Sequence, residues 1–370
     1  MSADNSSPDV LVPLRNLFNC VKSTRDRVRD GESNECSGTF SLSNFWETLD
    51  QAVKTTSQEA TKLSLMFSRP PVPSEQVHQP NPSFYHLQMR LTFELIRPFF
   101  SFQECAKLAD SFRKSILALS TVYFWLPKSQ GITLRRAVRD ATAEVFEGLV
   151  QLLDVILSSP LQSLSQDQLT STGGVWAACD QFNQLPKDNR SAVLTVLTSN
   201  VGLVKDALEE MEQALAESQD PFGDILDDDD MDVRGNQDTY WSQSDRDLIR
   251  QCQGLMKASG ACLRKLSSAV RNNGRVETEE NIAQLDDLAD VAKDVSPSID
   301  DLTLSLYPPV DRSAVDENVC KLAFVLKKLL YITRTSHICL EPDVSWVEFL
   351  DGAVNHNLEK VQSLLRDSNS

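Results

Sequence analysis

Apolar residues recur at intervals of three and four positions through most of this chain, the spacing that places them on one face of an α-helix. Alternating apolar and polar positions, which indicate half-buried strands, are almost absent. Turn sequences separate the helical stretches; in Leu126–Gly131, for example, Pro127 cannot continue a helix and Gly131 permits a reversal. The pattern predicts helices near 9–29, 43–67, 102–125, 132–157, 165–184, 187–217, 242–272, 278–294, 297–306, 312–336 and 344–366.

Short connections between long amphipathic helices favour antiparallel neighbours. We therefore predict an all-α fold made of two antiparallel helical bundles of four or five helices, vinculin- or catenin-like in general architecture. The 13 glycines among 370 residues, about half the average usage, also leave little material for hairpins.

An acidic segment, 219–239, is the clearest predicted domain boundary. It contains eight acidic residues and one basic residue, and its four consecutive aspartates repel one another and have poor helix propensity. We predict a flexible linker between an N-terminal bundle, 41–218, and a C-terminal bundle, 240–370. The last helix is a candidate to pack back across this boundary. Alternatively, Asp227, Asp228, Asp229 and Asp230 form an acidic docking surface for a basic partner.

Two further segments are set apart by their composition. Residues 1–40 are predicted to form an N-terminal helix outside the first bundle. A proline-rich stretch begins near 69 and introduces an insertion, about 69–103, into that bundle; five prolines fall within Arg69–Pro82. Proline removes a backbone donor and blocks helix continuation, so a loop is expected there.

The charge balance argues against direct nucleic-acid binding. The formal net charge is −17, from 53 acidic and 36 basic side chains. Residues 1–218 carry 25 acids and 20 bases, net −5, and residues 219–370 carry 28 acids and 16 bases, net −12. Because Lys and Arg contacts to phosphates supply most nucleic-acid affinity, protein partners are the better expectation.

The cysteine pattern and the N-terminal sequence suggest a reduced, intracellular protein. The eight cysteines form no CxxC pair and no disulfide framework, and the chain opens with a polar run instead of a signal sequence. No stretch of about 18 uninterrupted apolar residues is present, so no membrane span is predicted.

No motif for catalysis, a cofactor or a metal is found. The four histidines, at 78, 86, 337 and 356, do not have zinc-ligand spacing, and the GxSxG, GxxxxGK[ST], GxGxxG and HExxH motifs are absent. The carboxylate pairs Asp286-Asp287 and Asp300-Asp301 are expected to be solvated faces or helix caps. We therefore predict that this protein is not an enzyme.

The most regular feature is a heptad seam with steps of three and four residues. Its members are Leu194, Leu197, Val201, Val204, Leu208, Met211 and Leu215. The seam would either pair with a helix of a partner or pack inside its own bundle. We favour internal packing, because seven exposed apolar residues would promote aggregation of a free monomer. The preceding segment, LPKDNRSAV, lacks the basic region that contacts DNA in helix-loop-helix and zipper factors. A dimer formed through the seam would therefore sequester its partners from DNA.

Two serines resemble phosphorylation sites. Ser242 lies in an acid-directed context and Ser296 precedes a proline. Both are more simply explained as helix caps.

Several strings together resemble the vertebrate cyclin-D-binding protein family, also described as Grap- and cyclin-D-interacting proteins. The resemblance covers most of the chain from Ser41 onward, without a recognised counterpart for about 75–103. That stretch is a real insertion, a splice variant or a gene-model error. The strings are LPKSQGITLRR (126–136), VWAACDQFNQLPKDNRSAV (175–193), KDALEEMEQALAE (205–217), YWSQSDRDLI (240–249), AQLDDLADVAKDVSPSIDDLTLSLYPP (283–309) and SWVEFL (345–350).

The resemblance implies a non-enzymatic, all-helical regulator of the cell cycle. Its expected partners are D-type cyclins, a Grap-type adaptor protein and helix-loop-helix or other transcription regulators. It implies reduced kinase phosphorylation of the retinoblastoma protein, reduced transcription by factors that this protein restrains, and location in cytoplasm and nucleus. The α-helical pattern alone equally suits a cytoskeletal or junctional helical-bundle scaffold, which we keep as the alternative.

Overall fold

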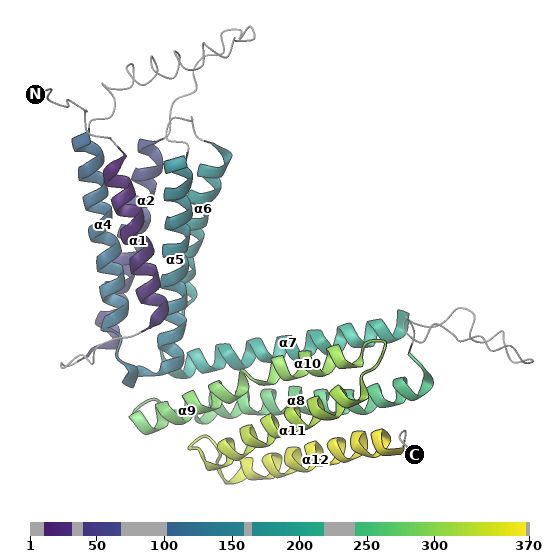
Figure 1. Ribbon diagram of the computed structural model, residues 1–370. Coiled ribbons are helices and arrows are strands. Elements are labelled where there is room, and N and C mark those ends of the chain that lie inside the picture. The colour runs from purple at the N-terminus through teal and green to yellow at the C-terminus, as the bar shows by residue number, and fades with distance from the viewer. Residues whose placement is uncertain (1–10, 32–39, 68–101, 159–164, 218–240, 368–370) are drawn as a thin grey trace, which may run out of the picture. The chain divides into compact units, whose positions relative to one another are not determined.

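The computed structural model describes residues 11–31, 40–67, 102–158, 165–217 and 241–367 (Figure 1). Within these ranges the regular structure is entirely helical, which confirms the all-α prediction. The predicted helix ranges agree with the observed ones to within a few residues. The helices are α1 (Val12–Asp30), α2 (Leu42–Met66), α4 (Phe102–Trp125), α5 (Ile132–Ser158), α6 (Gln166–Asp180), α7 (Asn189–Glu217), α8 (Gln243–Asn273), α9 (Glu279–Ala292), α10 (Val295–Leu306), α11 (Arg312–Thr335) and α12 (Val344–Asp367), with short 3₁₀ turns at Lys128–Gln130, Gln181–Gln184 and Glu341–Asp343.

The chain divides into two compact units. Unit 1 contains residues 1–128 and 135–185, and unit 2 contains residues 129–134 and 186–370. The structure differs here from the sequence prediction, which placed α7 in the first bundle, residues 1–40 outside that bundle and the boundary at 219–239. The reason is packing: α7 buries its apolar face against α8 and α10 and so belongs with the C-terminal helices (Figure 1). Helix α1 instead packs against α4 within unit 1.

In unit 1, α4 packs against both α1 and α2, and α2 also packs against α6. Aromatic and aliphatic side chains fill the interior, among them the fully buried Phe45 and Phe112. Ser41 caps α2 by accepting the Asn44 N–H at 3.5 Å, and α1 ends at Gly31, whose φ of 71° is readily accessible only to glycine.

Unit 2 is organised around α8, which packs against α7 and α12 as well as α11. About half of α8, 15 of its 31 residues, is buried, as expected for a helix surrounded by others. Trp241 precedes α8 and donates its indole N–H to the Leu306 carbonyl at 2.6 Å. The last helix, α12, packs against α8 and α11 within the same unit.

Some predictions fall outside the described residues. They are the flexibility of 219–239, the docking role of Asp227–Asp230, and the proline-rich loop up to residue 101. These stay predictions.

Candidate interaction surface

The heptad seam of α7 lies inside unit 2. Leu197, Val204 and Met211 are at most 1 % exposed. The other four seam residues, Leu194, Val201, Leu208 and Leu215, are partly buried against the same core. Internal packing is therefore confirmed, and a partner helix would reach the buried residues only if α7 moved away from this core. A partner-binding role for the seam stays a prediction.

The two candidate phosphorylation sites have different environments. Ser242 is exposed and caps α8: its Oγ accepts the Asp245 N–H at 3.2 Å, and the Asp245 carboxylate accepts the Ser242 N–H at 3.1 Å. Ser296 is only 7 % exposed and lies in the first turn of α10, whose N-cap is Asp294, so its expected capping role is wrong. Helix α10 starts two residues earlier than predicted. This is possible because Pro297 lies in the first turn, where a backbone N–H has no acceptor within the helix and is not needed. Phosphorylation at either site stays a prediction.

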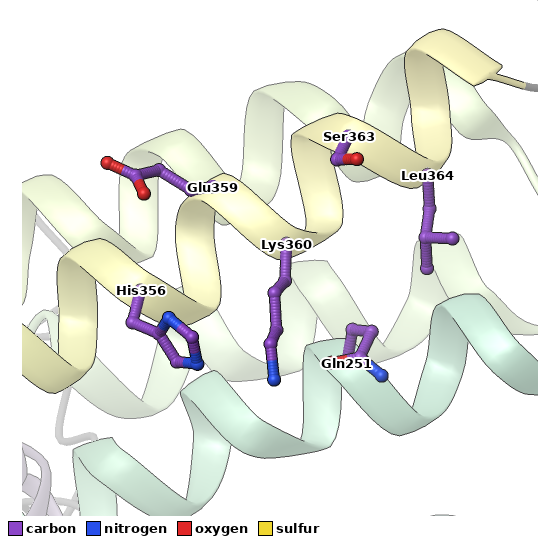
Figure 2. Close-up of a pocket in the computed structure, with 6 residues that line it drawn as sticks. All are labelled: Gln251, His356, Glu359, Lys360, Ser363 and Leu364. Carbon is purple, nitrogen blue, oxygen red and sulfur yellow. The ribbon is translucent and has the colours of Figure 1, made fainter.

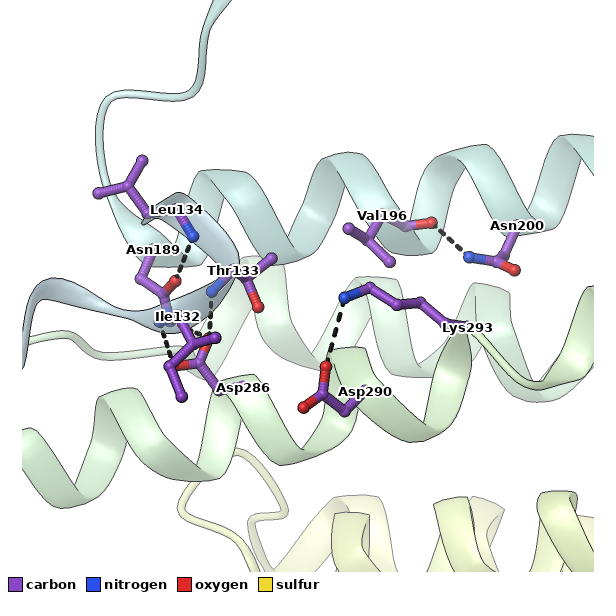
Figure 3. A network of polar contacts seen from close by, with 9 residues as sticks. All are labelled: Ile132, Thr133, Leu134, Asn189, Val196, Asn200, Asp286, Asp290 and Lys293. Atoms are coloured by element: carbon purple, nitrogen blue, oxygen red, sulfur yellow. Dashed lines mark hydrogen bonds and ion pairs between the residues drawn. The ribbon is translucent and has the colours of Figure 1, made fainter. Parts of the chain in front are cut away.

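A buried polar network holds the first turn of α5 (Figure 3). Asp286, 6 % exposed on α9, accepts the backbone N–H groups of Ile132 at 2.7 Å and Thr133 at 2.9 Å. It also accepts the Asn189 amide at 3.0 Å, while the Asn189 carbonyl accepts the Leu134 N–H at 3.0 Å. The first N–H groups of a helix have no partner within the helix, so this network satisfies three of them.

The network also explains the glycine before this turn. Gly131 has φ of 110°, and a Cβ added there would lie 2.0 Å from the Asn189 side chain. The sequence predicted the reversal at Gly131. Asp286 was expected to lie on a solvated face or to cap a helix. It caps α5, whose first residue, Ile132, is 154 positions away in the sequence. Asp287 is exposed. No local sequence signal separates these two aspartates.

His337 joins two loops of unit 2 through its imidazole. Its Nε2 accepts the Arg275 N–H at 3.0 Å, and its Nδ1 lies 2.8 Å from the Gln284 Oε1. Burial, with a smaller contribution from the charge of Arg275, lowers the pKa of His337, while Glu277 and Glu280 act in the opposite direction. The folded protein therefore favours the neutral imidazole, which alone can accept the Arg275 hydrogen bond.

We expect this histidine to make unit 2 sensitive to mild acid. Because the pKa of His337 is lowered in the folded state, neutral His337 contributes to the free energy of unfolding above the ordinary pKa of about 6.5. This stabilisation is lost as pH falls through the lowered pKa. Urea unfolding of the wild type and a His337→Gln variant, from pH 7.5 to pH 5, measures it. The wild type should lose more stability than the variant over this range; parallel profiles would contradict the expectation.

The described residues hold no cluster of potential metal ligands, and four of their thiols are buried. Within them, no group of three or more His, Cys, Asp or Glu side chains is placed to hold a metal ion. Burial raises the pKa of Cys105 and Cys179 to about 11 and that of Cys252 and Cys262 to about 12, so these thiols stay protonated near neutral pH. Across the same ranges, every helix is too short or too polar to span a lipid bilayer.

A shallow depression between α8 and α12 has a mixed lining (Figure 2). His356, Glu359 and Lys360 project from α12, and Gln251 comes from α8. Small-molecule sites are usually lined by apolar and aromatic side chains with a few convergent polar groups. The single aliphatic residue here, Leu364, does not provide such a lining.

The outward side of α11 carries an unusual pair of aromatic residues. Phe324 is 68 % exposed and Tyr331 is 69 % exposed, while residues on the opposite side of the helix fill the core. Lys327 and Lys328 lie between them in the sequence, half-buried and exposed respectively. We call these four residues the α11 face. The α11 face was not predicted from the sequence. For a single apolar residue outside the main apolar stripe of a helix, the sequence does not indicate whether another helix covers it.

Comparison with known proteins identifies the family. The protein-family model described as Grap2 and cyclin-D-interacting, N-terminal, matches residues 88–217. The corresponding C-terminal family model matches residues 226–331. The chain belongs to the Grap2 and cyclin-D-interacting protein family. The first of these matches begins at residue 88, so part of 75–103, predicted to lack a family counterpart, does have one.

Vertebrate relatives of this family align over nearly the whole chain. A cyclin-D1-binding protein 1 homolog of Danio rerio is 70 % identical over 368 residues, covering 99 % of each chain. The homolog of Xenopus laevis is 50 % identical, covering 95 % of this chain and 98 % of that protein. Cyclin-D1-binding protein 1 of Homo sapiens is 39 % identical, covering 96 % and 95 %. The resemblance read from the sequence strings is thereby confirmed.

The two family matches meet within the acidic segment, between residues 217 and 226. The compact units instead divide at residue 185. Helix α7 therefore belongs to the N-terminal family match by sequence and to unit 2 by packing. In this family member, the core of unit 2 combines α7, from the N-terminal match, with α8, α9 and α10, from the C-terminal match.

Proposed function

We propose that this protein binds a D-type cyclin and does so without catalysing a reaction. The observation that carries the proposal is the near full-length similarity to cyclin-D1-binding protein 1 in other vertebrates. The described residues support it by offering an exposed aromatic surface.

Direct binding between purified proteins tests this proposal. The full chain is immobilised, and a purified D-type cyclin and a purified A-type cyclin are passed over it in turn. We expect saturable binding of the D-type cyclin and much weaker binding of the A-type cyclin. Failure of the D-type cyclin to bind would overturn the proposal.

The downstream effects form a second layer of the proposal. By occupying cyclin D, the protein would reduce kinase phosphorylation of the retinoblastoma protein and so lower transcription by the factors that this protein restrains. Helix-loop-helix transcription regulators and a Grap-type adaptor are proposed as further partners, with action in both cytoplasm and nucleus. Kinase assays with added protein, and imaging of the tagged full chain, test these points.

The alternative of a cytoskeletal or junctional scaffold rests on architecture alone. We propose that the two units are antiparallel bundles of the four- or five-helix type, similar to those of vinculin and catenins. The cyclin names of the relatives favour the regulator over the scaffold. A pull-down with the intact chain separates them, because a scaffold would recover actin or junction proteins without cyclins.

A further inference from the structure

The α11 face combines exposed aromatic area with positive charge on a protein that is otherwise acidic. Aromatic side chains bury large areas when covered and are enriched at the centres of protein interfaces. Here Phe324 and Tyr331 are both about two-thirds exposed on one helix. Exposure of two aromatic side chains to water is unfavourable, and a partner protein that covers them would bury their apolar area.

The spacing of the two aromatic residues fits a helix. They are seven positions apart, which is two helical turns or about 10.5 Å along α11. A partner helix lying along α11 would meet this pair with two apolar residues at the same spacing.

The charges on α11 point to an acidic partner. Lys327 and Lys328 form no ion pair with the described residues. The cations at either end are already paired: Lys321 with Asp301 of α10 at 2.6 Å, and Arg334 with Glu348 of α12 at 3.2 Å. The two lysines between the aromatic residues are therefore the ones available to carboxylates of a partner.

The contrast with the rest of the chain strengthens this argument. Residues 312–335 contain five basic and two acidic residues, and three of the basic residues are paired with carboxylates outside α11, which leaves Lys327 and Lys328. Residues 219–370 as a whole carry net −12. An acidic partner is repelled by most of this region and attracted by α11. Charge complementarity of this kind steers association and sets the register of the contact.

We propose that the α11 face docks an acidic amphipathic helix of the D-type cyclin, with two apolar residues one heptad apart packed against Phe324 and Tyr331 and carboxylates on Lys327 and Lys328. The inference rests on the proposed function and adds to it the surface and the chemistry of recognition. The core of unit 2 does not take part, so the docking surface exists without rearrangement of the helices.

Surface variants of the full chain test the proposal. The first carries Phe324→Ser and Tyr331→Ser, and the second carries Lys327→Glu and Lys328→Glu. The control is Phe349→Ser, which removes an aromatic side chain that is 73 % exposed on α12. Because all these changes are at partly or largely exposed positions, circular dichroism should show melting temperatures close to that of the wild type.

Affinity for purified D-type cyclin is then measured at two salt concentrations. We expect the aromatic variant to bind at least tenfold more weakly and the charge variant to bind more weakly with reduced salt dependence, while the control stays within twofold of wild type. Normal binding by both α11 variants would overturn the inference and leave the proposed function intact. Absence of binding by the wild type would overturn both.

Two further outcomes would identify a different occupant. If light scattering shows that the wild type is a dimer and the aromatic variant a monomer, the face binds a second copy of this chain. If the variants bind cyclin more tightly than the wild type, the occupant is a segment of this chain that competes with cyclin. Either result overturns the inference.

Discussion

Replacing Leu197 with Asp should unfold unit 2. Leu197 is fully buried in the core formed by α7, α8 and their neighbours. A carboxylate placed there loses its hydration without gaining a partner, which should cost about 5 kcal/mol or more. Since whole domains are stable by only about 5–15 kcal/mol, most of the margin disappears. Thermal and urea unfolding followed by circular dichroism measure the loss.

The matched control for this change is on the same helix. Leu203→Asp introduces the same charge at a position that is 50 % exposed, and we expect it to change stability by less than about 1 kcal/mol. Leu208→Asp, at a half-buried seam position, should fall between the two. A Leu197→Asp protein that melts like the wild type, and loses only its partners, would show that the seam is a binding surface.

Removing the Asp286 carboxylate should destabilise unit 2 by about 3 kcal/mol, because each buried donor left without an acceptor costs roughly 1–3 kcal/mol. Asp286→Ala deprives the Ile132 and Thr133 N–H groups and the Asn189 amide of their common acceptor. The first turn of α5 should fray as a result. Urea unfolding gives the free energy, and hydrogen exchange at Ile132 and Thr133 reports the fraying.

The neighbouring aspartate provides the control for this experiment. Asp287→Ala changes the same charge one position away on the exposed side of α9, and stability should change by less than about 0.5 kcal/mol. Asp286→Asn keeps one acceptor oxygen and should show an intermediate loss. Equal effects of Asp286→Ala and Asp287→Ala would mean that the network contributes nothing beyond its charge.

Helix positions were predictable because they depend on local spacing. The periodic apolar residues of α7, the breaks at Pro127 and Gly131, and the cap at Ser242 all act within a few residues of chain. The family was likewise predictable, since the strings that carry it are contiguous. The start of α10 was not predictable, because Pro297 is tolerated equally just outside a helix and in its first turn.

The assignment of helices to units was decided only in the tertiary structure. A heptad seam requires an apolar neighbour but does not specify which one, so the sequence alone left open whether α7 packs with earlier helices, later helices or a partner. The composition of the acidic segment placed the predicted boundary at 219–239. The helices against which α7 packs, however, follow that segment in the sequence.

The chain by itself determined an acidic, all-helical protein of the cyclin-D-interacting family. Only the tertiary structure distinguished Asp286 from Asp287, and only there do Phe324 and Tyr331 become a surface. Burial of a side chain depends on which helices lie beside it, and those contacts join residues far apart in the chain. Local periodicity selects the face of a helix, but long-range packing decides which remaining side chains stay exposed to water.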